Sequence, residues 1–278
     1  MMPSEATRLI RESLGNRYDP REKSAITEWL MEDLTGLSRI DRLIRETPLS
    51  TEQLGKLQQY VEKLGADMPV QYITGYAWFR GEKFRVNEKV LIPRPETEEL
   101  VNWALDFIHP GMIVTDIGTG SGCIPVSIKK ECADVQVFAV DISQEALSLA
   151  QENARLFNTE INWIQLNILQ ASSVEPLPVS DIIISNPPYI PLRDIDSMER
   201  HVTEHEPHLA LFVPDEDALV FYKAILKVAE EKLRRGGQIF FETHHALAKT
   251  VAALSSWPAE IRCDVFGKER MVRIERPL

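Results

Sequence analysis

The feature that most constrains the fold is an alternation of short apolar stretches and helical patterns that begins near residue 112. The apolar stretches, which we expect to be strands, lie at 112–117, 135–142, 161–168, 181–185 and 238–243. Helical patterns are present at 144–157 and 217–235, and we expect Gly236-Gly237 to end the second helix. Strands that alternate with helices form mostly parallel sheets with helices on both faces. The pattern therefore predicts an α/β protein, with 263–266 and 271–274 as a closing antiparallel pair.

The chain before this alternation is helical in pattern and shows almost no strand signal. Helices are expected at 22–34 and 38–46, and a third is expected after Ser50, which can form a capping box with Gln53. Two apolar runs around a polar turn then predict a β-hairpin within residues 76–92. We therefore predict a helical bundle at 1–75, a hairpin linker at 76–95 and a larger domain at 96–278.

Composition limits the class of protein. The net charge is −11, from 31 basic and 42 acidic residues, which counts against tight binding to duplex DNA because that usually requires clustered Lys and Arg. No run of about 18 apolar residues is present, so no membrane span is expected. The first residues lack the apolar core of a secretory signal, and the 3 cysteines are too scattered for a disulfide framework. We expect a cytoplasmic monomer with reduced thiols that binds no nucleic acid directly.

A glycine-rich loop joins the first expected strand to the next helix. It runs Asp116-Ile117-Gly118-Thr119-Gly120-Ser121-Gly122. Glycine lets a ligand approach the backbone without a Cβ in the way, and the helix that follows presents unpaired N–H groups. The spacing differs from the G-x-G-x-x-G of dinucleotide sites, and Asp116 would repel a pyrophosphate but could help hold an ammonium group. These features favour S-adenosylmethionine over a nucleotide, with a purely structural turn as a further alternative.

Asp141 ends the second expected strand, one strand–helix–strand unit after Asp116. An ionised carboxylate has two acceptor oxygens and could accept both hydroxyls of a ribose. Enzymes that bind NAD also place an acid here, so Asp141 does not decide between cofactors. The alternative is a surface aspartate that caps the helix starting near Ser143.

The segment Asn186-Pro187-Pro188-Tyr189 directly follows the apolar strand at 181–185. Proline fixes φ and lacks an N–H donor, so this turn is stiff and its free groups are carbonyl oxygens and two side chains. The Asn186 side-chain oxygen and the Pro187 carbonyl could each accept one hydrogen of a planar NH2 group, on which Tyr189 could stack. The segment therefore predicts methylation of a planar nitrogen without a metal or a general base, and a rigid turn without chemistry is the alternative.

These motifs resemble those of class I methyltransferases that act on amino groups. Further stretches resemble the HemK/PrmC family of release factor glutamine methyltransferases, namely 71–75, 79–81, 90–98, Glu206-Pro207, Ala210-Leu211 and 264–270. The resemblance spans residues 70–276, and the helical N-terminal part agrees in size and kind. It implies a Rossmann-like class I methyltransferase sheet with a small N-terminal helical bundle and a β-hairpin linker.

The resemblance also implies an activity and a set of site residues. The activity is transfer of a methyl group from S-adenosylmethionine to the glutamine side-chain amide in the Gly-Gly-Gln motif of peptide-chain release factors, which the N-terminal bundle would help dock. The implied cofactor-binding residues are Gly118, Thr119, Gly120, Ser121, Gly122, Asp141, Asn167, Ile168 and Asn186. The implied substrate-binding residues are Asn186, Pro187, Pro188 and Tyr189, and the catalytic ones among them are Asn186, Pro187 and Tyr189.

The sequence departs from the family pattern at three places. Where the family often has an Asp that contacts the adenine region, this chain has Asn167, which can both donate and accept. The other departures lie at 212–215 and 242–245, and they concern local loop shape more than the reaction.

Three alternative interpretations use the same sequence. His201, His205 and His208 have a spacing that can place metal ligands on one helix face, but a polar loop facing the substrate is simpler and no metal is expected. A nucleic-acid amino-methyltransferase would methylate a similar planar nitrogen after base flipping, but the acidic charge does not support it. An oxidoreductase that uses NAD would leave the turn at 186–189 unexplained.

Overall fold

The computed structural model describes residues 1–15, 17–45, 47–170 and 174–278. The described chain divides into two compact units, each with a hydrophobic core of its own. The first unit contains Met1–Tyr76 and Glu199–His205, and the second contains Ala77–Met198 and Glu206–Leu278. The domain boundaries expected at residues 75 and 95 stay a prediction. The first unit also includes Glu199–His205, a segment far along the chain.

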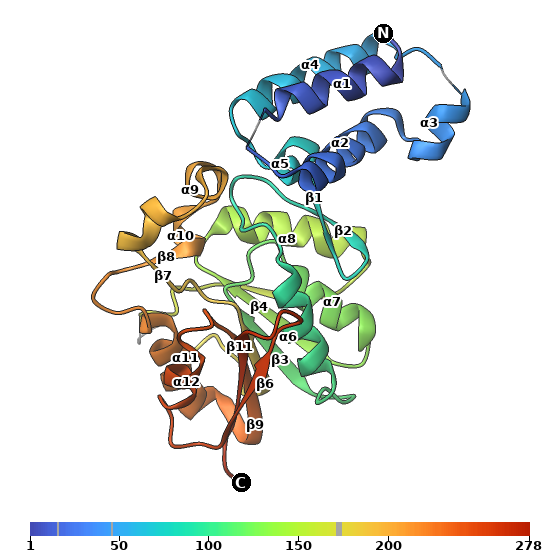
Figure 1. Ribbon diagram of the computed structural model, residues 1–278. Helices are drawn as coiled ribbons and strands as arrows, with labels where there is room; N and C mark the ends of the chain where they lie inside the picture. The colour runs from blue at the N-terminus through green and yellow to red at the C-terminus, as the bar shows by residue number, and fades with distance from the viewer. Residues whose placement is uncertain (16, 46, 171–173) are drawn as a thin grey trace. The chain divides into compact units, whose positions relative to one another are not determined.

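The first unit is a helical bundle (Figure 1). Its helices are α1 (Pro3–Ser13), α2 (Pro20–Thr35), α3 (Arg39–Arg45), α4 (Thr51–Gly65), α5 (Val70–Thr74) and α9 (Arg200–His205). Helix α2 begins earlier than the sequence predicts because the Asp19 side chain accepts hydrogen bonds from two backbone N–H groups, and Pro20 suits the first turn. The capping box expected between Ser50 and Gln53 is confirmed, with donor–acceptor distances of 2.9 and 3.2 Å.

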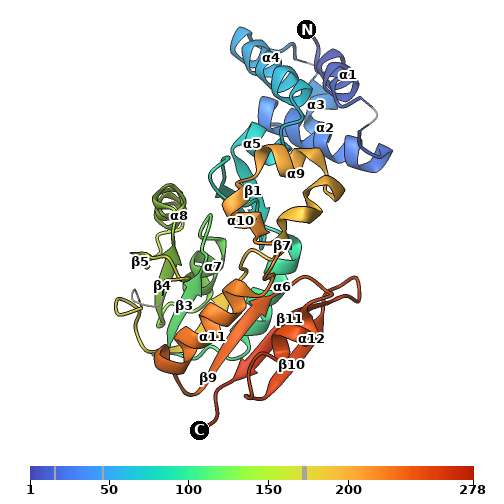
Figure 2. The ribbon, with the colours of Figure 1, turned by 90° about the vertical axis from the view of Figure 1, so that its left-hand side faces the viewer.

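The second unit is built on a seven-stranded sheet (Figure 2). Its strands, in spatial order, are β10 (Ala259–Cys263), β11 (Glu269–Glu275), β9 (Leu233–Glu242), β6 (Ser180–Ser185), β3 (Ile113–Ile117), β4 (Gln136–Asp141) and β5 (Asn162–Gln165). Strand β11 is antiparallel to β10 and β9, and the other neighbours are parallel. The predicted α/β class is confirmed, and so is the position of β6 beside β3, the strand that enters the glycine loop.

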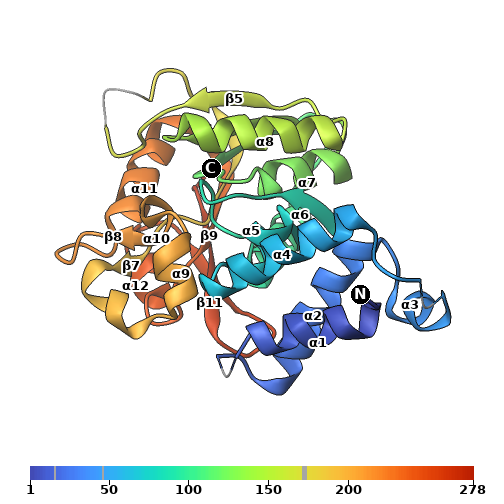
Figure 3. The same ribbon diagram turned by 90° about the horizontal axis from the view of Figure 1, so that it is seen from above.

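Helices cover both faces of this sheet (Figure 3). Helices α6 (Pro95–Leu105), α7 (Cys123–Glu131) and α8 (Gln144–Leu156) cover one face, and α11 (Val220–Lys232) and α12 (Ala248–Ala252) cover the other. Successive side chains of a strand point to opposite faces. In β6, Ile182 and Ile184 accordingly belong to the core under α6 and α7, whereas Ile183 belongs to the core under α11 and α12. Burial on both faces explains why this strand is apolar throughout its middle.

Short elements flank the sheet. The predicted hairpin is confirmed as β1 (Tyr76–Phe79) and β2 (Glu82–Arg85). Between β6 and α11 the second unit contains β7 (Ile190–Pro191), the 3-10 helix η2 (Leu192–Ser197), α10 (His208–Leu211) and β8 (Phe212–Val213). Strands β7 and β8 pair in parallel, which ties together the two ends of the excursion that contains α9. Of the helices in the described ranges, none is long and apolar enough to cross a membrane.

The expectation that Gly236-Gly237 ends a helix is wrong. Helix α11 ends at Lys232, and the two glycines lie inside β9. The pairing of β9 with β6 shifts register between Ser180 and Ile182, and a Cβ on Gly237 would lie 2.8 Å from two backbone carbonyl oxygens. These glycines therefore permit an irregular strand in which backbones approach closely.

Two other expected strands have different bounds. Strand β5 ends at Gln165, before the apolar residues Leu166 and Ile168, which form part of the core around α11. Strand β10 ends at Cys263 because the next five residues form a tight turn, in which the Asp264 N–H donates to the Lys268 carbonyl at 2.8 Å. Prediction from apolar character alone therefore made the first of these strands too long and placed the second too far along the chain.

Candidate functional site

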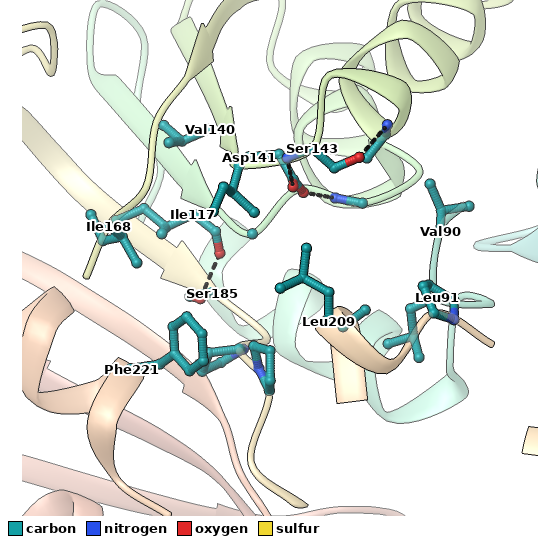
Figure 4. A pocket seen from close by; sticks show the side chains of 18 of the residues that line it. Val90, Leu91, Ile117, Val140, Asp141, Ser143, Ile168, Ser185, Leu209 and Phe221 are labelled. Atoms are coloured by element: carbon teal, nitrogen blue, oxygen red, sulfur yellow. Dashed lines mark hydrogen bonds between the residues drawn. The ribbon is translucent and has the colours of Figure 1, made fainter. Parts of the chain in front are cut away.

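A cavity of about 500 Å³ lies in the second unit where β3, β4 and β6 end (Figure 4). Its walls are the loops after β3, β5 and β6, the junction of β4 with α8, the segment before α6, and parts of α10 and α11. Open α/β sheets bind ligands at the carboxyl ends of their strands, so this is the expected place for a cofactor.

Most of the residues predicted to bind cofactor or substrate lie on the wall of this cavity. These residues are Gly118, Gly120, Asp141, Asn167, Ile168, Asn186, Pro187 and Pro188. The described wall does not include Thr119, Ser121, Gly122 or Tyr189. The first three are buried within the loop after β3, where their role is to shape it. Cofactor and substrate contacts of all the named residues stay predictions.

The loop after β3 is held by the end of β4. The backbone N–H groups of Gly118 and Thr119 donate to the Val140 carbonyl at 2.8 and 3.0 Å. Gly118, Gly120 and Gly122 have φ of 80°, 52° and 79°, in the left-handed region that favours glycine. At Gly122 a Cβ would also lie 2.9 Å from the Cβ of Ala150 on α8. Two of the glycines therefore line the cavity, and the third permits close packing of α8.

The Asp141 side chain is hydrogen-bonded both to the glycine loop and to the residue that caps α8 (Figure 4). One of its carboxylate oxygens accepts from the Gly120 N–H and the other from the Ser143 N–H, each at 2.9 Å. Burial raises its pKa, and these backbone hydrogen bonds oppose the rise. Each carboxylate oxygen has a second lone pair, so Asp141 can still accept a hydroxyl from the cavity. The cap of α8 is Ser143, whose hydroxyl accepts from the Ala146 N–H at 3.1 Å.

Behind the glycine loop lies a fully buried carboxylate, Asp116. Neither of its oxygens has a hydrogen bond of normal geometry to another described residue. Burial raises its pKa to about 7, the nearby Thr119 hydroxyl lowers it, and the charge of Asp141 raises it further. A buried and unpaired carboxylate at this position fits a ligand that places positive charge near the loop.

One end of the cavity is apolar. Ile117, Val140, Ile168 and Phe221 project toward it from four different elements (Figure 4). The side-chain oxygen of Asn167 accepts from the Leu169 N–H at 3.0 Å, which fixes the loop after β5. Apolar walls with a few polar groups are typical of pockets for flat ring systems.

The turn after β6 forms a further part of the wall, next to Ile117. The Ser185 hydroxyl donates to the Ile117 carbonyl at 2.6 Å, which fixes the end of β6 against β3. Asn186 is half-buried, and its side-chain Nδ2 donates to the Thr97 hydroxyl at 3.1 Å. Within the described chain, no donor is bonded to the Asn186 Oδ1. An acceptor oxygen of Asn186 is therefore available at a cavity wall formed by two prolines and a buried strand end.

Tyr189 is placed differently from the ring that the sequence predicts beside the acceptor. Its side chain packs against the core around α11, and its ring centre lies 6.2 Å from that of His244. Burial raises the pKa of its phenol, and the charge of Glu242 raises it further. Stacking of Tyr189 on a substrate stays a prediction.

Reasoning from sequence missed several wall residues, among them Phe221, and the structural role of Glu206, which lies next to the wall residue Pro207. Phe221 lies on the same face of α11 as the buried residues Ile225 and Val228 and packs partly against the core, so the apolar pattern of the helix does not distinguish it as a wall residue. Glu206 is buried, accepts from the Ile92 N–H at 3.1 Å and from the Arg94 guanidinium at 2.5 Å, and so fixes the segment before α6 next to α10. Nothing local in the sequence links residues so far apart.

The three histidines for which the sequence allowed a metal site lie on two different helices. His201 and His205 belong to α9, and His208 begins α10. The His205 Nε2 lies 2.9 Å from the Ala66 carbonyl oxygen within the first unit. The His208 ring contacts that of Phe212, with ring centres 5.0 Å apart.

Comparison with known proteins identifies relatives of the whole chain. Residues 5–75 match the family model "PrmC N-terminal domain", and 104–209 match "Methyltransferase small domain". The release factor glutamine methyltransferase of Flavobacterium psychrophilum is 37% identical over 273 residues, covering 95% of each chain. That of Bacteroides thetaiotaomicron is 37% identical over 275 residues, covering 97% of this chain and 99% of the relative.

A solved structure supports the fold alone. The structure of a methyltransferase from Pyrococcus furiosus superimposes with a TM-score of 0.53 at 16% identity, covering 72% of this chain and 91% of that one. Together with the strand order, this similarity confirms the predicted Rossmann-like methyltransferase sheet.

Proposed function

The chain belongs to the release factor glutamine methyltransferase family, and we propose that it methylates the side-chain amide of the glutamine in the Gly-Gly-Gln motif of a peptide-chain release factor. The chain is a methyltransferase that uses S-adenosylmethionine. The observation that carries the proposed acceptor is the Asn186 side chain, which is held by its nitrogen and has its oxygen available at the end of β6.

The cavity fits this cofactor. When bound, S-adenosylmethionine supplies an electrophilic methyl group on a sulfonium. Gly118 and Gly120 leave the backbone open to close approach, and Asp141 retains acceptor sites for ribose hydroxyls. Asp116 supplies negative charge behind the loop, and Ile168 with Phe221 supplies an apolar surface for a flat base.

The turn after β6 suits a planar amide. An amide nitrogen is a weak nucleophile because its lone pair is delocalised into the carbonyl group. The Asn186 Oδ1 and the Pro187 carbonyl would each accept one N–H, which holds the nitrogen and turns its lone pair toward the cofactor. Fixed dipoles and orientation supply the catalysis, and the nitrogen loses its proton once it has been alkylated.

The first unit would then help to dock the release factor. Its helix α3 exposes Ile40, Leu43 and Ile44, with 69–75% of each side chain accessible. Exposed apolar groups that lie together often mark a protein-binding surface. The net charge of −11 supports a protein substrate over nucleic acid. We further propose that the enzyme acts as a monomer in the cytoplasm.

Mass spectrometry of a release factor after incubation with the protein and S-adenosylmethionine tests this proposal. We expect one added methyl group on the glutamine of the Gly-Gly-Gln motif, and none on a release factor in which alanine replaces that glutamine. Parallel reactions contain DNA and transfer RNA with labelled cofactor. Label on either nucleic acid together with an unmodified release factor would reject the proposed substrate.

A further inference from the structure

We infer that Thr97 and Glu242 are positioning residues, which orient the Asn186 side-chain amide so that its oxygen faces the substrate NH2. This inference rests on the proposed function, because it explains how the proposed acceptor oxygen is presented. It adds two residues from distant parts of the chain to a site that is otherwise formed by the turn after β6.

The fold brings these three side chains together at the ends of two strands and the start of a helix. Strands β6 and β9 are parallel, and Ser185 pairs with Phe241, so Asn186, which follows β6, lies level with Glu242, the last residue of β9. Thr97 lies in the first turn of α6. Its hydroxyl accepts from the Asn186 Nδ2 at 3.1 Å and donates to the Glu242 Oε2 at 2.6 Å. The contact between Thr97 and Glu242 joins residues 145 positions apart.

Glu242 is rigidly held. It is 2% exposed, and its backbone pairs with Met271 on β11. Its carbonyl oxygen accepts from the Tyr222 hydroxyl at 3.1 Å, and that tyrosine is fully buried. Thr97 is 3% exposed. A buried carboxylate on a backbone held in this way, and bonded to a buried threonine, can impose one direction on the hydrogen bonds that follow from it.

The proton count determines that direction. An ionised carboxylate has no proton to donate, so the Thr97 hydroxyl must use its single proton toward Glu242. The Thr97 oxygen can then only accept on its other side. Asn186 must therefore present its NH2 group to Thr97, which leaves its oxygen for the cavity. A flipped amide would place two oxygens against each other without a proton between them.

Protonation of Glu242 removes this constraint, because its carboxyl group can then donate to Thr97 and free the threonine proton for Asn186. Burial raises the pKa of Glu242 to about 7; the Thr97 hydrogen bond lowers it, Glu96 raises it, and Arg270 and Arg94 lower it. The neighbouring Tyr189, Tyr222 and Cys123 side chains, whose own pKa values are raised, stay neutral. Turnover should therefore rise as the pH increases through neutrality.

Steady-state kinetics on three variants tests the inference. Glu242→Gln and Thr97→Val nearly retain side-chain volume. A glutamine at 242 can donate as well as accept, and a valine at 97 can do neither, so in both variants Asn186 is no longer forced to donate. Thr97→Ser retains the hydroxyl. We expect the first two to lower kcat by about 10–100-fold at pH 8, as loss of a supporting hydrogen bond typically does. We expect Thr97→Ser to stay within about threefold of the unmodified protein, and the affinity for S-adenosylmethionine, measured by calorimetry, to stay within about twofold in all three.

The pH profile separates positioning from mere stability. The part of the acidic limb of kcat that Glu242 causes should disappear in Glu242→Gln and remain in Thr97→Ser, and any limb from Asp116 should be the same in both. Unchanged kcat in both Glu242→Gln and Thr97→Val, or an acidic limb in Glu242→Gln that matches that of the unmodified protein, would overturn the inference. If Thr97→Val unfolds at the assay temperature, Glu242→Gln alone decides. Failure of the unmodified protein to methylate a release factor would instead reject the proposed function.

Discussion

Replacement of Glu242 by Gln should change how the stability of the protein depends on pH. The side chain is 2% exposed, and burial raises its pKa from 4.5 to about 7. Below pH 4.5 the folded and unfolded chains both carry the proton. Between pH 4.5 and about 7 the unfolded chain releases the proton and the folded chain retains it. The free energy of unfolding must therefore fall as the pH rises through this window.

The size of this effect follows from the shift. The folded and unfolded pKa values of Glu242 differ by about 2.5, and each pKa unit is worth about 1.36 kcal/mol. The free energy of unfolding therefore falls by about 3 kcal/mol, and this loss is complete above pH 7. Glutamine has nearly the same shape and no charge, so Glu242→Gln should lack this loss. The variant should be more stable than the unmodified protein by about 2–3 kcal/mol at pH 8, and similar to it at pH 4.5.

Urea unfolding at several pH values measures the difference. Asp116, whose pKa is also raised to about 7 by burial, contributes equally to both proteins and cancels in the comparison. Glu230→Gln, a loss of one carboxylate at an exposed position on α11, serves as the control and should show no such divergence. A constant difference between Glu242→Gln and the unmodified protein from pH 4.5 to 8 would refute the reasoning.

Three further substitutions test separate parts of the site. Gly122→Ala should destabilise the protein by about 2–5 kcal/mol in thermal unfolding, because φ is 79° and the new Cβ would lie 2.9 Å from that of Ala150. The control Gly111→Ala, where φ is 82° but the surrounding space is open, should cost only about 1–2 kcal/mol. Equal losses in the two variants would refute the packing argument. Asn186→Ala should lower turnover by about 100-fold with cofactor affinity within several-fold, and equal losses of both would contradict its role. Asp141→Asn should weaken S-adenosylmethionine binding by about 10–100-fold in calorimetry, since it loses charged hydrogen bonds to the loop, and unchanged affinity would argue against a cofactor role.

The parts of the site that could be predicted from sequence are those in which strand, loop and ligand group are adjacent in the chain. Gly118 and Gly120 lie in the loop after β3, Asp141 is the last residue of β4, and parallel strands end at one edge of a sheet. Asn186 and Pro187 follow the neighbouring strand, so their place at the same edge could also be inferred. For these residues the local pattern and the topology point to one location.

The remaining parts depend on packing between distant segments. Thr97 and Glu242 meet across 145 residues, and each looks like an ordinary helix or strand residue locally. Tyr189 packs partly against the core around α11, a contact that the sequence did not indicate, and its stacking on a substrate stays a prediction. Gly236-Gly237 resembled a helix end, but these glycines lie in β9 where its pairing with β6 shifts register. Such features are set by tertiary contacts, which override local signals.

A crystal structure with S-adenosylhomocysteine and a peptide that contains Gly-Gly-Gln tests the central claim most directly. We expect the glutamine amide nitrogen within roughly 2.7–3.2 Å of both the Asn186 Oδ1 and the Pro187 carbonyl oxygen, with the Asn186 Nδ2 still bonded to Thr97. A glutamine bound elsewhere, or an Asn186 that turns its nitrogen toward the peptide, would contradict it.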